Sequence, residues 1–183
     1  DMPTSRGLGD VYKRQIAGCL MQFNVLQRSR GRFAFATLDD GSGRIEVSIW
    51  ADVFEKYRTL IKKGQLLVVE GIVERDNYSD SIKYKIIAER IMTFNQARRE
   101  YIKNIKISIN GDTENIISDI KEIANSKDGN SILISYKGNS ANADISLPNE
   151  YTVELNDDSI RDLEKRFGTE NIQFVYHSQH HIN

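Results

Sequence analysis

Aromatic and cationic residues are closely interleaved between residues 28 and 50. Phe33 and Phe35 lie two residues apart, in a stretch where they alternate with Ala34 and Ala36. Aromatic rings beside cations bind single-stranded nucleic acids, because bases stack on the rings while the cations attract the phosphates. This stretch therefore indicates a base-stacking surface, provided that the two phenylalanines point away from the hydrophobic core.

Further cations and one more large ring occur where neighbouring strands are expected. The candidate nucleic-acid-binding residues are Arg28, Arg30, Arg32, Phe33, Phe35, Arg44, Trp50, Lys83 and Lys85. Trp50 would either extend the stacking surface or cover a helix. The alternative is a purely structural role, in which Phe33 and Phe35 belong to the core and the arginines only flank a solvated loop.

The elements that must position these residues follow from the apolar periodicity of residues 16–92. Apolar alternation predicts five short strands, and helical spacing of apolar residues over 51–64 predicts one helix between the third and fourth. Gly71 marks a bend or bulge in the fourth strand. This order predicts an OB-fold barrel, whose narrow interior suits small residues such as Ala34 and Ala36. This favours phenylalanines that point outward, and a core position for them stays the alternative.

The second half has a different order of elements. Its periodicities predict strand, helix, three strands, helix and strand, which is a small mixed α/β domain. The fold class is therefore β plus α/β. The expected domains are a non-native or disordered leader at 1–15, which resembles translated sequencing-adapter sequence, an OB-fold domain at 16–92, a connecting helix at 93–103, the α/β domain at 104–178 and a tail at 179–183.

Charge separates the two halves. Residues 16–103 hold 15 Lys and Arg against 11 Asp and Glu, whereas residues 104–183 hold 7 against 13. Such an asymmetry suggests different partners for the two domains, and the acidic half would repel phosphate. Ile172, Phe174 and Tyr176 share one face of the last strand and could dock a protein if that strand is an edge. A central, fully covered strand is the alternative.

The sequence offers little for catalysis or for a cofactor. Asp39 and Asp40 suit a turn, and the single Cys19 fits a reducing compartment such as the cytoplasm. His177 and its neighbours in the tail could bind zinc only with further ligands, and a frayed end is the simpler interpretation. We therefore expect a non-catalytic chain without cofactor or metal, and we find no apolar run that would span a membrane.

Residues 16–178 resemble the C-terminal region of the bacterial DNA polymerase III alpha subunit, densely in the first half and loosely in the second. The matching segments are Ile16-Ala17-Gly18, Phe35-x-x-Leu38-x-Asp40, Gly43-Arg44-Ile45-Glu46-Val47, Phe54-x-x-Tyr57-x-x-Leu60, Leu67-Val68-Val69-Glu70-Gly71, "SIKYKIIAERIM", "ILISYK" and "LEKRFGTENIQFVY". The wider superfamily includes anticodon-binding domains of class II aminoacyl-tRNA synthetases. In those domains the phenylalanine of F-x-x-L-x-D stacks on an anticodon base, and Phe35 matches it.

The resemblance implies a fragment of a DNA-directed DNA polymerase that lacks the polymerase active site. It implies that the OB-fold domain holds single-stranded template DNA, and that the C-terminal domain docks to the tau subunit of the clamp loader within the holoenzyme. A tRNA anticodon-binding module is the alternative function. An OB scaffold that binds only protein is a further one.

Overall fold

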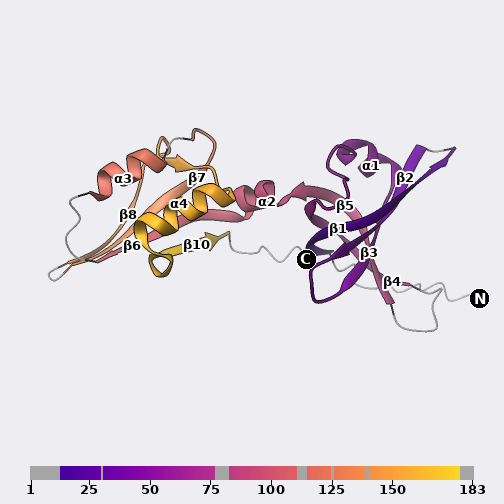
Figure 1. The fold of residues 1–183 in the computed structure, drawn as a ribbon, viewed down its shortest axis with the longest axis horizontal. Helices are drawn as coiled ribbons and strands as arrows, with labels where there is room; N and C mark the ends of the chain where they lie inside the picture. The colour runs from indigo at the N-terminus through magenta and orange to yellow at the C-terminus, as the bar shows by residue number, and fades with distance from the viewer. Residues whose placement is uncertain are drawn as a thin grey trace, which may run out of the picture. The chain divides into compact units, whose positions relative to one another are not determined.

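The computed structural model describes residues 13–29, 31–76, 83–110, 115–124, 126–138 and 141–177, with only the backbone described for Asp76 and Lys83. These residues fall into two compact units, the first ending at Phe94 and the second beginning at Asn95 (Figure 1). Each unit has a hydrophobic core of its own. Within the described ranges, no helix is long and apolar enough to cross a membrane.

The first unit is a closed barrel with the strand order β1-β2-β3-β5-β4. Its elements are β1 (Lys13–Arg28), β2 (Gly31–Asp39), β3 (Arg44–Ile49), α1 (Ala51–Tyr57), β4 (Leu66–Asp76) and β5 (Lys83–Thr93). Neighbouring strands are antiparallel except β3 and β5, which pair in parallel over only three residue pairs. Five strands with a helix between the third and the fourth confirm the predicted OB-fold barrel.

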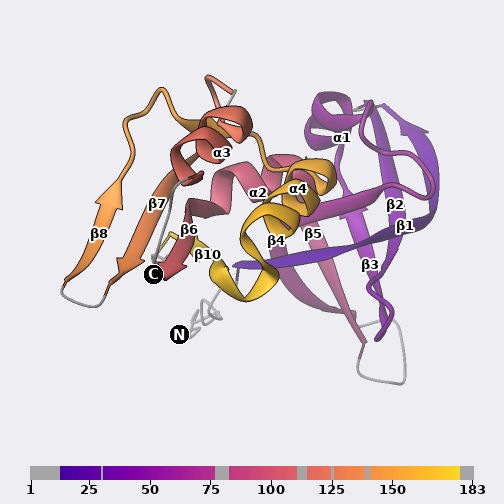
Figure 2. The ribbon, with the colours of Figure 1, turned by 60° about the vertical axis from the view of Figure 1, so that its left-hand side comes forward.

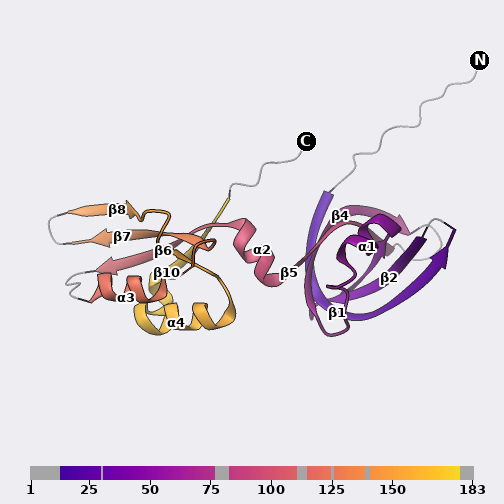
Figure 3. The same ribbon diagram turned by 90° about the horizontal axis from the view of Figure 1, so that it is seen from above.

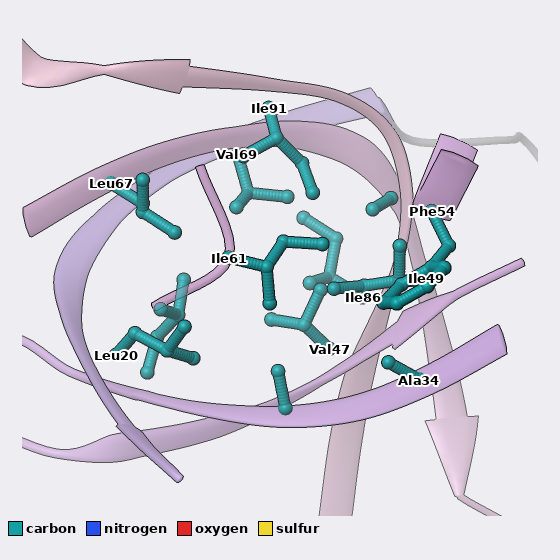
Figure 4. Packing of buried hydrophobic residues seen from close by; sticks show 13 residues of the cluster. Leu20, Ala34, Val47, Ile49, Phe54, Ile61, Leu67, Val69, Ile86 and Ile91 are labelled. Carbon is teal, nitrogen blue, oxygen red and sulfur yellow. The ribbon is translucent and has the colours of Figure 1, made fainter. Parts of the chain in front are cut away.

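The barrel interior is filled by one inward-facing residue set from every strand (Figure 4). Leu20, Val47 and Ile86 belong to this set and are almost fully buried. Ala34 and Ala36 of β2 also point inward and are buried in the same cluster. The helix α1 lies over one end of the barrel and adds Phe54 to the core (Figure 3).

Helix α1 is shorter than the apolar spacing predicted. It ends at Tyr57, and the chain then forms two tight turns, with the amide of Leu60 donating to the carbonyl of Tyr57 and that of Gln65 to Lys62. Ile61 nevertheless reaches the barrel core from this irregular segment. Periodicity could not distinguish the two conformations, because the turns place the same apolar side chains on the same side.

Gly71 lies at the predicted irregularity of β4. The pairing of β4 with β5 shifts register between Glu70 and Gly71. A Cβ atom at Gly71 would collide with the backbone carbonyl of Ile87, so the two strands approach each other too closely for any side chain there.

The second unit is a sheet with the strand order β10-β6-β7-β8, to which a short strand is added. Its elements are α2 (Phe94–Tyr101), β6 (Ile102–Asn110), α3 (Ile116–Ile123), β7 (Asn130–Lys137), β8 (Asn142–Ser146), β9 (Thr152–Val153), α4 (Asp157–Phe167), a 3-10 turn (Thr169–Asn171) and β10 (Ile172–Tyr176). Helices α3 and α4 lie on one face of the sheet (Figures 2 and 3). Ile120 and Leu163 from these helices pack on Ile105 and Ile107 of β6.

Helix α4 has the ends that the sequence predicts. The side chain of Asn156 accepts hydrogen bonds from the backbone amides of Asp158 and Ser159, and Gly168 ends the helix with a φ of 83°. Arg166 in its last turn donates to Asp119 and Glu122 of α3, at 3.2 and 2.7 Å. These ion pairs join the two helices that cover the sheet.

Strand β10 is an edge of this sheet among the described strands, and it is only partly available as a docking surface. Ile172 and Phe174 pack against the core of their own unit. The register with β6 shifts between Val175 and Tyr176, and Tyr176 is 62% exposed. Of the three residues predicted to form an apolar docking surface, Ile172 and Phe174 are partly buried against their own core, and Tyr176 is the exposed one.

Candidate nucleic-acid interface

Three aromatic side chains gather on the outer side of β2 and at the end of β3. Because Ala34 and Ala36 face the barrel core, Phe33 and Phe35, which alternate with them, face outward. The ring centroids of Phe33 and Phe35 are 5.6 Å apart and the rings are perpendicular, whereas those of Phe33 and Trp50 are 5.7 Å apart and tilted by 33°. We call Phe33, Phe35 and Trp50 the aromatic face.

The three rings differ in what they offer a ligand. Trp50 is 48% exposed and Phe35 is partly exposed, but Phe33 is only 5% exposed. Phe33 therefore matches neither alternative that the sequence left open. It does not belong to the barrel core, and its neighbours leave too little of its surface for a base to stack on.

Trp50 lies at the junction of β3 and α1. It follows the last residue of β3 directly, in an extended conformation, and its carbonyl accepts a hydrogen bond of 2.8 Å from the amide of Phe54. The residue thus begins the helix with its backbone while its ring lies against Phe33. Of the two interpretations of Trp50, the contact with Phe33 favours an extension of the aromatic face.

Strand β1 adds outer residues that the sequence analysis missed. Leu26 pairs with Phe33 and Asn24 with Phe35, so both lie beside the aromatic face. The register of β1 and β2 shifts between Leu20 and Gln22. This bulge exchanges the inner and outer sides of β1, and strict alternation from Leu20 would have assigned Asn24 and Leu26 to the core side.

Arg28 is the cation that lies closest to the rings. Its guanidinium carbon is 5.2 Å from the centroid of Phe33. At this distance the positive charge is attracted to the aromatic ring, and the planar group still has N–H donors for a phosphate. Arg28 therefore combines ring contact with the charge that a nucleic-acid backbone requires.

Arg32 has a different environment. Its Nε and Nη2 atoms donate to Oε1 of Glu55 at 3.0 and 2.8 Å, and its guanidinium lies 5.8 Å from the ring of Phe54. These contacts tie β2 to α1. The sequence predicted that Arg32 binds nucleic acid. It could not predict the ion pair with Glu55, which is 23 residues away on another element.

Arg44 and the turn before it form a second group of charged contacts. Its Nε donates to Oδ2 of Asp39 at 2.8 Å, and this bond is the main cause that lowers the pKa of Asp39, followed by the amide of Gly41. The hydroxyl of Ser42 and the amides of Ser42 and Gly43 lower the pKa of Asp40. Both carboxylates are thus turn formers, as the sequence predicted.

Of the three remaining candidate cations, only Lys85 has a described side chain. Lys85 is partly buried in β5, where its backbone is in register with Glu46 of β3. Arg30 and the side chain of Lys83 lie outside the described residues. Among the cations whose side chains are described, Arg28 is thus the one in direct contact with the aromatic face.

This arrangement suits bases better than it suits a small polar substrate. The exposed ring of Trp50 and the partly exposed ring of Phe35 give apolar surface that any base can stack on. Polar neighbours such as Asn24 can form hydrogen bonds with base edges. The charged groups nearby are largely paired with carboxylates.

Comparison with known proteins gives the same fold for the first unit. Residues 15–94 match the family model described as OB-fold nucleic acid binding domain, tRNA_anti-codon. Over 165 residues the chain is 28% identical to the DNA polymerase III subunit alpha of Pseudomonas aeruginosa, covering 88% of this chain and 14% of that protein. The same subunit of Escherichia coli O6:H1 is 35% identical over 108 residues, which cover 58% of this chain and 9% of that protein.

A solved structure is also similar. The second single-stranded DNA binding protein of Mycobacterium smegmatis has a TM-score of 0.42 and 14% identity, covering 48% of this chain and 92% of that chain. The chain spans about a seventh of the length of the first polymerase subunit to which it is similar. Residues 15–94 thus fold as a closed five-stranded barrel and are similar in sequence to the family of OB-fold nucleic acid binding domains.

Proposed function

We propose that the barrel binds single-stranded DNA on the aromatic face, as part of a replicative DNA polymerase III alpha subunit. The observation that carries this proposal is the exposed ring of Trp50 beside the partly exposed ring of Phe35, on the outside of a barrel whose interior is already filled. The similarity to alpha subunits over 88% of the chain supports DNA as the ligand.

We expect the proposed binding to be weak, because most cations near the aromatic face are already paired. Arg32 and Arg44 are each paired with a carboxylate, so the phosphates of a bound strand meet few uncommitted cations. Weak binding suffices when a module is tethered next to its ligand, since the effective concentration then reaches about the millimolar range. In a polymerase, the barrel would hold the template strand that the rest of the protein has already engaged.

Fluorescence anisotropy of labelled oligonucleotides tests the proposal. We expect the chain to bind single-stranded DNA more tightly than duplex DNA of the same length, because bases in a duplex are not free to stack on protein rings. Phe35→Ala should weaken the binding of single-stranded DNA. Tyr176→Ala is its matched control, since it removes an exposed ring from the second unit and should leave this binding unchanged. Equal or tighter binding of the duplex would refute a base-stacking surface.

An anticodon stem-loop RNA belongs in the same assay. The family model carries the name tRNA_anti-codon, which favours RNA as the second candidate ligand. A single-stranded loop presents bases to the same rings, so Phe35→Ala would weaken either complex. If the stem-loop binds clearly more tightly than single-stranded DNA of equal length, the anticodon function replaces the proposed one.

The second unit is proposed to dock the tau subunit of the clamp loader. Its acidic charge and its exposed edge residue Tyr176 support a protein partner rather than DNA. Removing all residues after Gly168 would also take Ile172 and Phe174 out of the core, so a point change is the sharper test. Immobilised tau should retain the wild-type chain and Phe35→Ala, and should retain Tyr176→Ala less. Equal retention of all three would exclude this edge.

A further inference from the structure

Phe33 is buried although it lies outside the barrel core. Its side chain is 5% exposed and does not belong to the hydrophobic cluster that fills the barrel. Its cover comes from three chain segments, namely Phe35 in its own strand, Trp50 after β3 and Arg28 at the end of β1. A ring enclosed in this way contacts its neighbouring side chains and has little surface left for a ligand.

We infer that Phe33 is a positioning residue, which holds Trp50, Phe35 and Arg28 in the arrangement that a single strand needs; this inference rests on the proposed function. The perpendicular contact with Phe35, at 5.6 Å, restricts the plane of that ring. The tilted contact with Trp50, at 5.7 Å, does the same for the indole. The perpendicular arrangement is one that aromatic pairs prefer, and both centroid distances lie within the usual range of such pairs.

Phe33 also positions the positive charge of Arg28. The guanidinium carbon of Arg28 lies 5.2 Å from the centroid of Phe33, within the range of a favourable cation–π contact. A single buried ring therefore determines where two stacking surfaces and one phosphate-binding cation lie. Without it, each of these side chains would have to be ordered during binding, and that lost conformational freedom lowers affinity.

The chain offers a direct readout of this role. Trp50 is its only tryptophan, so selectively excited tryptophan emission reports on the aromatic face alone. In the full chain, Phe33→Leu should shift the emission of the free protein toward that of a solvated indole and increase quenching by acrylamide. It should also weaken binding of a labelled oligo(dT) by about fivefold to tenfold, comparable to losing part of one stacked base. Phe33→Tyr, which keeps the ring, should restore both properties.

A destabilised barrel must not be mistaken for a misplaced ring. Val69→Ala removes buried methyl groups from β4, on the core side of the barrel, and lowers the melting temperature without touching the aromatic face. Measured well below its melting temperature, this variant should keep the wild-type emission and affinity. A loss of oligo(dT) affinity in Val69→Ala equal to that in Phe33→Leu would make stability the cause and would overturn the positioning role.

The outcomes separate the inference from the function on which it rests. If the wild-type chain binds single-stranded DNA and Phe33→Leu binds it equally tightly, the positioning role is wrong while the proposed function stands. If Phe33→Leu binds less tightly but its tryptophan emission and quenching are unchanged, the ring does not hold Trp50 and the inference fails as well. If the wild-type chain binds no single-stranded DNA, the proposed function fails and the positioning role fails with it.

Discussion

Among single residues, Phe35 makes the sharpest distinction between binding and folding. Its ring is partly exposed on the outside of the barrel, so Phe35→Ala should weaken single-strand binding by about 1–3 kcal/mol. The free energy of unfolding should fall by less than the roughly 3–5 kcal/mol that a core phenylalanine costs. Thermal melts beside anisotropy titrations measure both quantities. A core-sized loss of stability with unchanged affinity would assign Phe35 to folding.

Two arginines four residues apart should behave in opposite ways. Arg28→Ala should weaken DNA binding and make the logarithmic salt dependence shallower by about 0.7, the value for one phosphate contact on a single strand. Arg32→Ala should leave that slope unchanged, because its guanidinium is already paired with Glu55. Titrations at several salt concentrations give the slopes. Identical slopes for both variants would contradict this division.

The sequence predicted the side of β2 on which these residues lie, but not their partners. Because a narrow barrel favours small inward residues, alternation with two alanines favoured an outward position for Phe33 and Phe35 over a core position. The burial of Phe33 depends on Trp50 and Arg28, which other strands bring to it. The pairing of Arg32 with Glu55 likewise depends on where α1 packs. Contacts between elements carry no local signal in a sequence.

Among the elements, the β2–β3 turn links stability to pH. The pKa values of Asp39 and Asp40 are lowered in the folded state, so both carboxylates stabilise the fold above their unfolded pKa of about 3.9. That contribution disappears as the pH falls through the lower folded values. Below about pH 4, the free energy of unfolding should therefore fall more steeply for the wild type than for the double variant Asp39→Asn, Asp40→Asn. Urea denaturation across this range measures the difference, and parallel curves would argue against it.

Strand β4 should be intolerant of a side chain at its bulge. Gly71→Ala should lower the free energy of unfolding by about 1–3 kcal/mol, because the new methyl group collides with the backbone of β5. Gly43→Ala is the matched control, since a Cβ there meets no atom within 4 Å. Its effect should stay within about 0.5 kcal/mol. Chemical denaturation compares the two, and equal losses would show that the close approach is not the cause.

Elements with regular patterns were predictable, and irregular ones were not. The order of the elements along the chain, the bend at Gly71 and both ends of α4 follow from alternation, a glycine and capping residues. The early end of α1 and the bulge after Leu20 do not, since each keeps the apolar residues at a spacing that a regular element also satisfies. Tertiary packing decides between such conformations.

For the whole molecule, two separate cores predict two separable activities. A chain of residues 13–94 should bind oligonucleotides as the full chain does, whereas residues 95–177 should not, because that unit is acidic and lacks the aromatic face. Circular dichroism shows whether each piece folds, and anisotropy shows which one binds DNA. Oligonucleotide binding by the second piece at the affinity of the first would contradict this assignment.

The parallel junction of β3 and β5 has a consequence for the order in which the barrel assembles. It holds three residue pairs and joins segments about 40 residues apart, whereas β4 and β5 form a long local hairpin. Closing a long loop for so few contacts is slow, so this junction should form after the rate-limiting barrier. Val47→Ala should then accelerate unfolding and leave the folding rate nearly unchanged. Amides along the same junction should exchange with deuterium before those between β4 and β5, which makes it the place where a closed barrel first opens.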